Sequence, residues 1–399
     1  MRKQFVVVLV LIVSVWMASP TRAATRSTRK SSSSGVSESP HAQRRIAHLR
    51  HTRATRSSYA RRHRRSYERF YMSSYADDLT EGDVIAGEDL VVRAAAIEAL
   101  GNMNGTVLAI DPDSGRVLAM VNQKLALSGG AQPCSTIKVA VALAALNERV
   151  VDKDTPIVLG RRSRMTLTDA LAHSNNAYFE ALGRRLGFEK VSYYAHEFGL
   201  GELAGYNIPG EHLGVFPSQE LAASAGGVGK MCSFGESISM TPLQLGALMS
   251  AIANGGTLFY LQHPTTPEEV SSFVPKVKRQ LDIAPLLPSM ADGMAGAVEY
   301  GTARSVRYSF SEEPVLGKTG TCSHDGTRFG WFASYAKTDR GRIATVVFLR
   351  GGRPTFGPKA AEIAGRMYRN LYDHNFFVPI APATHASTLP AGEPVSASQ

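Results

Sequence analysis

The 399-residue sequence is poor in cysteine, in long apolar runs and, over most of its length, in net positive charge. Its three cysteines lack the paired spacing of a zinc site, so we expect no bound metal. The apolar run at residues 5–18 is shorter than the roughly 20 residues that a membrane-spanning helix needs. No internal repeat is present. The 44% of hydrophobic residues still allows one large core with appendages.

Positive charge is confined to one segment of the chain. Residues 22–70 contain 14 Lys or Arg and only two acidic residues, Glu38 and Glu68. Arg2 and Lys3 add two more charges, so residues 71–399 are left with a net charge of −4 within the total of +10. Because the body is not basic, we expect no nucleic-acid partner.

The first 23 residues have the pattern of an export signal. Arg2 and Lys3 precede the apolar run, and the small residues Thr21 and Ala23 follow it. We prefer cleavage after Ala23. An uncleaved membrane anchor is the alternative, because charges on both flanks give a weak orientation signal. Both alternatives predict an exported protein, in the periplasm or at the outer face of the cytoplasmic membrane.

Residues 24–85 are predicted to form a disordered basic linker. Ser, Arg and His dominate there, and too few apolar residues are present to offset the ordering entropy. Attraction of residues 24–70 to an anionic membrane or cell-wall polymer is a further hypothesis, and a DNA-binding arm is the weakest one. The Pro/Ala/Ser/Thr-rich residues 374–399 are predicted to be a disordered tail. A folded body is left at 86–373.

The body combines helical and strand patterns. Helical periodicity is predicted at 90–100, after residue 133, in three pieces over 167–198, at 241–256 and around 360–372. A hairpin is predicted over 105–122, and three further strands at 314–323, 328–336 and 342–350. This order predicts an α+β fold, with a mixed, mainly antiparallel sheet flanked by helices and a helical subdomain.

The first of three chemically informative motifs is S-T-I-K, residues 135–138, at the start of an apolar helical run. Residues i and i+3 of a helix are neighbours, so Lys138 Nζ can reach Ser135 Oγ. Pro133 suits a helix start, and the helix dipole there favours negative charge on Oγ. Burial would lower the pKa of the lysine and let it act as a base. A capping serine with a solvated lysine is the simpler interpretation of this motif taken alone.

The second motif is S-N-N, residues 174–176, at the joint between two predicted helices. Ser and Asn are ordinary capping and turn residues, and that interpretation competes with a functional one. In the functional interpretation Ser174 relays a proton, and the side-chain amide of Asn176 holds a substrate amide.

The third motif is K-T-G-T, within a predicted strand. Gly320 would let a substrate backbone approach the strand closely. A cation and two hydroxyls suited to an anionic group flank this glycine, namely Lys318, Thr319 and Thr321. A phosphate-binding loop around this G-K-T is excluded, because position 312, where it needs a glycine, is Glu312.

The three motifs in this order resemble the signature of penicillin-binding proteins and class A β-lactamases. The sequence resembles the penicillin-binding transpeptidase family over roughly residues 90–372. The likeness extends beyond the motifs to VLAIDPDSGRVLAMV, LTDALAHSNNAYFEALGRRLGFEKVSYYAHEFGLG, NIPGEHLGVFP, MTPLQLGALMSAIANGG and GWFASYA. Large members of that family carry a pedestal or glycosyltransferase domain before the transpeptidase, where only the linker stands here.

The resemblance implies a serine acyl-enzyme mechanism without a cofactor. Ser135 would attack the carbonyl of a D-Ala–D-Ala stem peptide of peptidoglycan or of a β-lactam, and Lys138 would take its proton. Ser174, between the two lysines, would pass a proton to the leaving nitrogen. Backbone N–H groups of Ser135 and Thr321 would form the oxyanion hole. The resemblance assigns substrate binding to Asn176, Lys318, Thr319 and Thr321.

The resemblance leaves the fate of the acyl-enzyme open. Transfer to an amine defines a DD-transpeptidase, which we favour, transfer to water a DD-carboxypeptidase, and rapid hydrolysis of an acylated drug a β-lactamase. Glu211 stands about where a class A β-lactamase keeps its deacylating glutamate, but its surroundings resemble the transpeptidases more. Gly235 and Glu236 depart from the Gly-Gln-Gly that the family usually shows. A non-catalytic sensor is less favoured, since no signalling domain accompanies the body.

Two cysteines flank the motifs directly. Cys134 precedes the serine of the first motif, and Cys322 follows the third. The family fold would set them side by side, and class A carbapenem-hydrolysing β-lactamases carry a disulfide at these motif-relative positions. In an exported protein we therefore expect a Cys134–Cys322 disulfide, with two reduced, buried thiols as the alternative. Cys232 would remain a free thiol.

Overall fold

The computed structural model describes residues 68–160, 163–338 and 341–377. The export signal predicted at 1–23, residues 24–67 of the predicted linker and residues 378–399 of the predicted tail lie outside this part of the chain. Across the described ranges, no helix is both long enough and apolar enough to cross a bilayer.

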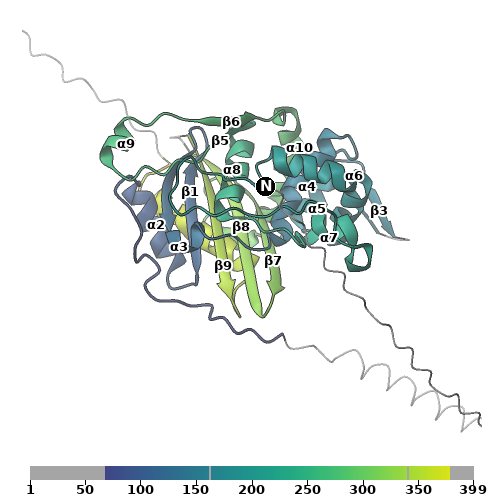
Figure 1. The fold of residues 1–399 in the computed structure, drawn as a ribbon, viewed down its shortest axis with the longest axis horizontal. Coiled ribbons are helices and arrows are strands. Elements are labelled where there is room, and N and C mark those ends of the chain that lie inside the picture. Colours follow the sequence, from purple (N-terminus) through teal and green to yellow (C-terminus); the bar gives the residue numbers. More distant parts are fainter. Residues whose placement is uncertain (1–67, 161–162, 339–340, 378–399) are drawn as a thin grey trace, which may run out of the picture. The chain divides into compact units, whose positions relative to one another are not determined.

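A five-stranded antiparallel sheet forms the centre of the body (Figure 1). The strand order is β2-β1-β9-β8-β7, so the first hairpin of the chain lies beside the last three strands. The strands are β1 (Gly105–Asp111), β2 (Arg116–Val121), β7 (Val315–His324), β8 (Thr327–Thr338) and β9 (Gly341–Gly351). Two short hairpins lie outside this sheet, β3 (Ile157–Gly160) with β4 (Ser163–Met165) and β5 (Thr257–Phe259) with β6 (Val277–Gln280). The predicted α+β class is confirmed.

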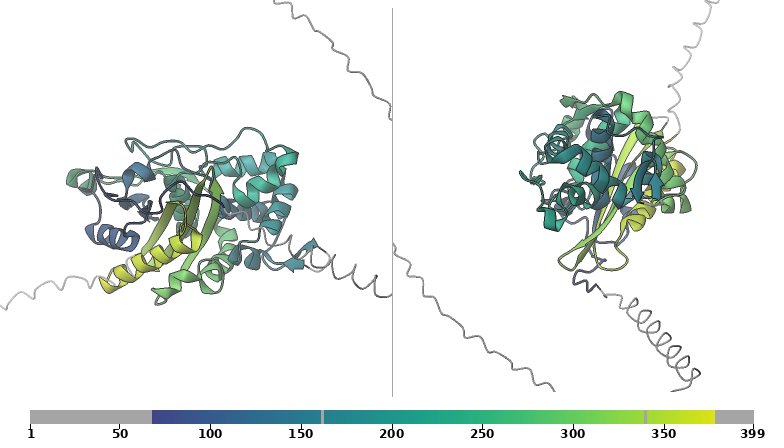
Figure 2. Two further views of the ribbon diagram at one scale, coloured as in Figure 1. Left: turned by 90° about the horizontal axis from the view of Figure 1, so that it is seen from below. Right: turned by 90° about the vertical axis from the view of Figure 1, so that its right-hand side faces the viewer.

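Helices cover both faces of the sheet and form a separate group beside its β7 edge (Figures 1 and 2). The α-helices are α2 (Leu90–Leu100), α3 (Gln123–Ala126), α4 (Lys138–Asn147), α5 (Leu167–Ala172), α6 (Asn176–Glu197), α7 (Gly227–Phe234), α8 (Pro242–Asn254), α9 (Pro267–Ser271), α10 (Leu287–Glu299) and α11 (Gly357–Asp373). The 3-10 turns are η1 (Cys134–Ile137), η2 (Ala223–Ala225), η3 (Ala284–Leu286) and η4 (Arg304–Tyr308).

The central strands are buried on both faces because their side chains alternate between two cores. On β1, Val107 and Ala109 pack with α2 and α11, whereas Leu108 and Ile110 pack with α8 and the helical group. All four are fully buried. Because helices cover both faces of the sheet, the side chains on both faces of such a strand are apolar. Its sequence is therefore a continuous apolar run and does not alternate between apolar and polar residues.

The predicted helices occur at their predicted places, with one detail at Gly187. The helix α6 is kinked at this residue, where φ is 77° and ψ is 161°, values that are not helical. The third helix predicted from 189 onwards therefore exists as the second half of α6. The helix α8 begins with a reciprocal capping box, in which Thr241 and Gln244 bond each other's backbone N–H groups.

The folded body starts before residue 86, which corrects the predicted boundary of the linker. Ser74 is buried, and its Oγ accepts hydrogen bonds from Gly352 N at 3.0 Å and from Thr355 Oγ1 at 2.9 Å. Gly351, at φ 151°, lets this segment approach, because a Cβ there would lie 2.6 Å from the Cα of Ser74. The backbone of Ser74 also accepts from Asn104 N at 2.8 Å.

A buried ionic cluster anchors the same segment. Arg93 on α2 donates to Asp83 and to Glu88 at 2.8 Å each, and all three side chains are at most 7% exposed. Asp83 also accepts from the backbone N–H groups of residues 122 and 123, and Glu88 from Met120 N at 3.0 Å. The carboxylate of Asp83, within the predicted linker, is thus a hydrogen-bonded partner of the core.

The start of the predicted tail also belongs to the fold. Phe376 and Phe377 follow the end of α11 and are 9% and 3% exposed. Phe377 packs against Phe310 with ring centroids 5.5 Å apart. Burial of these two aromatic rings stabilises the start of the predicted tail against the body, although the residues that follow are largely polar.

Candidate active site

Ser135 lies in the 3-10 turn η1, directly before α4. Pro133 precedes the turn, as predicted for a helix start, but α-helical geometry begins only at Lys138. Cys134 has φ 53°, a left-handed conformation that is uncommon for a residue other than glycine. The i, i+3 relation survives in the turn, and Lys138 Nζ lies 3.0 Å from Ser135 Oγ.

Lys138 is fully buried and is surrounded by oxygen atoms. Its Nζ donates to the carbonyl and the hydroxyl of Ser174 at 2.7 and 3.1 Å and to Asn176 Oδ1 at 2.6 Å. The Phe179 ring covers it, with the centroid 5.5 Å away. Burial lowers the pKa of Lys138 to about 7, against a smaller opposing effect of the Glu180 carboxylate. A large fraction of neutral amine therefore stands beside the serine at neutral pH.

Ser174 links the first lysine to a second. Its Oγ accepts from Lys318 Nζ at 2.8 Å as well as from Lys138. Lys318 is fully buried, and its pKa is lowered well below its ordinary value by burial and by the charge of Lys138. Ser174 has φ 55°, so two residues of the site, Ser174 and Cys134, hold left-handed backbones. The three predicted motifs meet at this hydroxyl.

The hydroxyls of the third motif lie beside the two lysines. Thr319 Oγ1 donates to Thr302 Oγ1 at 2.7 Å, and Thr302 N donates to Ala172 O at 3.1 Å. Thr302 therefore connects β7 to the end of α5, next to the Ser174 turn. Thr321 Oγ1 accepts from Gly357 N at 2.8 Å, which leaves its own hydrogen to donate.

Gly320 has a packing role that was not predicted from the sequence. A Cβ at this position would lie 2.8 Å from Pro133 O and 3.3 Å from the Cβ of Cys134. Its missing side chain therefore lets β7 approach the turn that carries Ser135. The sequence could not show this, because Pro133 is distant in the chain.

Three contacts hold the Ser135 turn against its surroundings. Cys134 and Cys322 form a disulfide between η1 and β7. Trp331 Nε1 on β8 donates to Gln132 O at 3.0 Å. Gly235, with φ 68°, packs so closely that a Cβ there would lie 2.4 Å from Pro133 Cγ. Sequence reasoning missed Gln132, Trp331 and Thr302, because common polar and aromatic residues give no local signal of such long-range contacts.

Two other residues singled out from the sequence have structural partners. Glu211 is partly buried, and its carboxylate accepts from the backbone N–H groups of Ala204 and Gly205 at 2.8 to 3.1 Å. Burial raises its pKa, and these hydrogen bonds oppose the rise. Cys232 is a buried free thiol whose pKa is raised to about 12 by burial, so it is unreactive near neutral pH.

Comparison with protein families gives one match to the body. The family described as the penicillin binding protein transpeptidase domain matches residues 105–372. This range contains all three motifs and covers more than half of the chain.

Curated relatives align over the same region. Stage V sporulation protein D of Bacillus subtilis is 28% identical over 66% of this chain and 48% of its own length. The peptidoglycan D,D-transpeptidase MrdA of Acinetobacter baumannii is 24% identical over 77% of this chain and 56% of its own length. The chain thus spans about half the length of the curated relatives it matches.

Solved structures share the fold. A peptidoglycan glycosyltransferase from Burkholderia ambifaria superposes with a TM-score of 0.61 at 18% identity, covering 74% of this chain and 99% of that one. PBP2 of Pseudomonas aeruginosa, solved in complex with WCK 5153, gives a TM-score of 0.59 at 23% identity, covering 72% and 77%. At these identities the likeness shows the fold alone.

Proposed function

This chain belongs to the penicillin-binding protein transpeptidase family, and we propose that it is a serine D,D-transpeptidase. Its substrates would be D-Ala–D-Ala stem peptides of peptidoglycan, and penicillins would acylate it. The observation that carries the proposal is the 3.0 Å contact between Ser135 Oγ and the Nζ of a buried lysine. In the described ranges no carboxylate forms an ion pair with Lys138 or Lys318, so the low lysine pKa values are not offset by a salt bridge.

Acylation begins with proton transfer from Ser135 to Lys138. Neutral Lys138 accepts the proton as Oγ attacks the substrate carbonyl, and the backbone N–H groups of Ser135 and Thr321 donate to the developing oxyanion. The proton then has to reach the leaving nitrogen. Ser174 Oγ contacts both lysines, at 3.1 and 2.8 Å, and supports a relay from Lys138 through this hydroxyl.

Substrate binding falls to groups at the rim of the same network. Asn176 uses its amide oxygen on Lys138, so its amide N–H is what remains for a substrate carbonyl. Thr321 would hold the substrate carboxylate with its free hydroxyl hydrogen, and Thr319 would join it once its hydroxyl turns away from Thr302. Lys318 lies behind these hydroxyls, where its buried Nζ donates to Ser174 and to the carbonyl of Thr319.

Export and contact with the cell envelope are part of the proposal. The pattern of residues 1–23 and the substrate both support action outside the cytoplasm. The basic residues 24–70 would contact anionic head groups or wall polymers through screened electrostatic attraction.

A time course with a fluorescent penicillin tests the function. Wild-type chain is expected to form a stable covalent adduct on Ser135, and Ser135→Ala is expected to form none because the nucleophile is gone. The measurement is in-gel fluorescence with mass spectrometry of the labelled peptide. The matched control is Ser311→Ala, an exposed serine outside the network, which should label like the wild type.

The outcomes separate the candidate activities. A label that persists supports a penicillin-binding transpeptidase. A label that appears and is lost within minutes would instead indicate a β-lactamase, and equal labelling of wild type and Ser135→Ala would refute the assignment of the nucleophile.

A further inference from the structure

Thr302 lies outside the three motifs, in the short segment between α10 and η4, and its backbone is fixed against the active site. Its N–H donates to the carbonyl of Ala172, which stands two residues before Ser174, at 3.1 Å. Gly301 packs on the same carbonyl, so closely that a Cβ there would lie 2.2 Å from the oxygen. The segment around Thr302 therefore has a defined position relative to the Ser174 turn.

The side chain of Thr302 contacts the third motif. Its Oγ1 lies 2.7 Å from Thr319 Oγ1, the ordinary length of a hydrogen bond between two hydroxyls. The other contact of the Thr302 hydroxyl, to Ala172 O, is 3.5 Å long and correspondingly weak. A hydroxyl carries one hydrogen and can accept as well as donate, so the short bond can run in either direction, and its reversal loses only the weak contact.

The neighbouring Thr321 shows what a donor to the hydroxyl oxygen achieves. It lies two residues beyond Thr319 on β7, and therefore on the same face of the strand. Its Oγ1 accepts from Gly357 N at 2.8 Å, which leaves its hydrogen for an anion. In the described residues Thr319 Oγ1 accepts no such backbone bond, and Thr302 is the hydroxyl placed to donate to it.

We propose that Thr302 is a positioning residue for the carboxylate of the substrate or of a penicillin. When the carboxylate binds, the hydrogen of Thr319 turns to it, and Thr302 turns its own hydrogen from Ala172 O to Thr319 Oγ1. Thr319 and Thr321 then both accept from the protein and both donate to the carboxylate. This inference rests on the proposed transpeptidase function and adds a residue that acts on the substrate through another side chain.

Reversal of this hydrogen bond favours an anion over a neutral group. In the free site Thr319 donates to a neutral hydroxyl, whereas in the complex it donates to a charged acceptor, and charge-assisted hydrogen bonds are roughly twice as strong as neutral ones. A hydroxyl that accepts one bond while it donates another is also polarised, which strengthens the bond it donates. Thr302 should therefore affect a ligand with a carboxylate far more than the same ligand with a neutral amide.

A pair of β-lactams tests this dependence on the full chain. One is a penicillin, and the other is its carboxamide, in which a neutral amide replaces the carboxylate. Competition with fluorescent penicillin for Ser135 gives the second-order rate constant of acylation for each, and the readout is the ratio of the two constants. Because both constants come from one preparation, their ratio does not depend on the fraction of folded molecules.

Thr302→Ala should lower this ratio by about tenfold, the effect of one charge-assisted hydrogen bond, and leave the rate constant for the carboxamide near the wild-type value. Thr302→Ser keeps the hydroxyl and should retain most of the ratio. Thr319→Ala should lower the ratio to a similar extent. Adding Thr302→Ala to that variant should change nothing further, because Thr302 acts through Thr319. The exposed Thr80→Ala is the matched control and should give the wild-type ratio.

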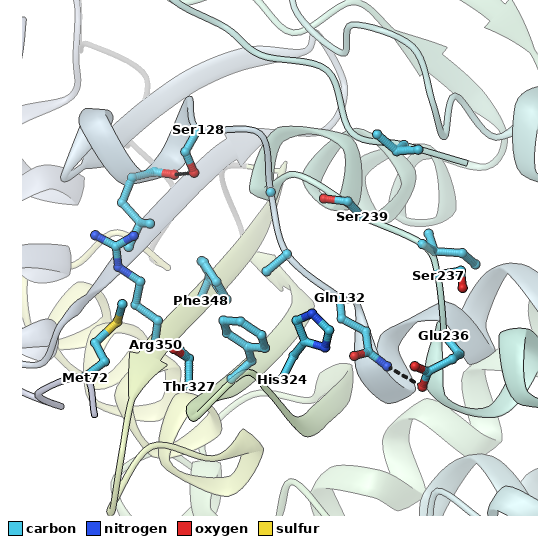
Figure 3. Close-up of a pocket in the computed structure, with 16 residues that line it drawn as sticks. Met72, Ser128, Gln132, Glu236, Ser237, Ser239, His324, Thr327, Phe348 and Arg350 are labelled. Atoms are coloured by element: carbon cyan, nitrogen blue, oxygen red, sulfur yellow. Dashed lines mark hydrogen bonds between the residues drawn. The ribbon is translucent and has the colours of Figure 1, made fainter. Parts of the chain in front are cut away.

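Arg350→Gln is a second control, because Arg350 is a cation near the Ser135 turn that could attract a carboxylate instead. It lines a cavity of about 540 Å³ whose wall also includes Met72, Gln132 and Glu236 (Figure 3). None of the four residues of the third motif lines this cavity. Arg350→Gln should therefore leave the ratio unchanged.

A ratio that stays unchanged in Thr302→Ala, or that falls again when Thr302→Ala is added to Thr319→Ala, would overturn the proposal. So would a ratio that rises, because Thr302 would then only compete with the carboxylate for the Thr319 hydrogen. Loss of the ratio in Arg350→Gln would also overturn it, since the carboxylate would then bind in the cavity. In all these cases penicillin still labels Ser135 and the proposed function stands, whereas absence of labelling would refute the function itself.

Discussion

Two regions of this molecule bury cations in opposite ways. Arg93 lies between the carboxylates of Asp83 and Glu88, at 2.8 Å from each. Burial would lower its pKa, but the two carboxylates outweigh that effect and the pKa is raised. Lys138 and Lys318 lie among hydroxyl, carbonyl and amide oxygens instead, and the pKa of each is lowered.

This difference in pKa indicates that the buried arginine has a structural role and that the buried lysines can take part in proton transfer. An arginine between two carboxylates stays protonated at any pH at which the protein is folded, so it can only hold elements together. A buried lysine with neutral partners can lose its proton near neutral pH and take it back. The comparison predicts that the first site controls stability and the second controls the rate of acylation.

The largest effect is expected from Lys138→Met, which removes the base and keeps the apolar stem. Acylation by fluorescent penicillin should slow by about 10²- to 10⁴-fold, the usual contribution of a general base. The measurement is the second-order rate constant of labelling. Lys138→Arg should not restore it, because a guanidinium does not release its proton.

The control for this lysine is Lys124→Met, which replaces an exposed lysine on α3. It should label at the wild-type rate. A Lys138→Met variant that labels within about threefold of the wild type, far less than a general base contributes, would show that another group accepts the serine proton.

Arg93→Met is expected to act on stability instead. Removing the arginine leaves two buried carboxylates without their cation, which typically costs about 3–5 kcal/mol. Thermal and denaturant unfolding measure the loss, and labelling per folded molecule should stay close to the wild-type value. Arg164→Met, at an exposed arginine of β4, is the matched control with no expected change.

A smaller effect, about tenfold per pH unit, is expected in the pH dependence of acylation. Since the pKa of Lys138 is about 7, the neutral base predominates above that pH, and the rate should fall as the pH drops below it. The same shift predicts a change in stability. Between pH 7 and 10.5 the unfolded lysine binds a proton that the folded one does not, so stability falls as pH is lowered through this window and levels off below about 7.

The pH profile of the acylation rate should differ between variants of the two cation sites. A Lys138→Met variant should lose the rise in acylation rate near pH 7 and keep only its slow residual rate. Arg93→Met should keep the rise, because Arg93 has no contact with Lys138, Ser135 or Ser174 in the described residues. A wild-type rate that does not change with pH across roughly 1.5 units on either side of that value would contradict the proposed base.

The fold was predictable where local signals agree. The turn at Asp111–Gly115 with apolar runs on both sides specified the first hairpin, and Thr241, Pro242 and Gln244 specified the start of α8. In the site, the spacing of Ser135 and Lys138 predicted the contact between their side chains, because residues i and i+3 are neighbours in a 3-10 turn as well as in an α-helix.

The sequence failed where a residue acts through a distant partner. Asp83 and Ser74 lie in a polar stretch, and only their contacts with Arg93 and with residues 352 and 355 make them part of the body. The close approach of Gly320 to Pro133 was not predicted, because Pro133 is 187 positions earlier in the chain. The prediction that the three motifs converge on one site rested on the family resemblance. Secondary-structure propensity alone would not have predicted it.

The ordered segment that begins at residue 68 has a practical consequence for inhibitor screening. A fragment that starts at residue 86, where the composition changes, would delete Met72 from the cavity wall and Asp83 from the partners of Arg93. Such a fragment would present an altered surface near the Ser135 turn and would leave Arg93 with Glu88 as its only carboxylate partner of the two. Recombinant material for ligand discovery therefore has to retain everything from residue 68 onwards.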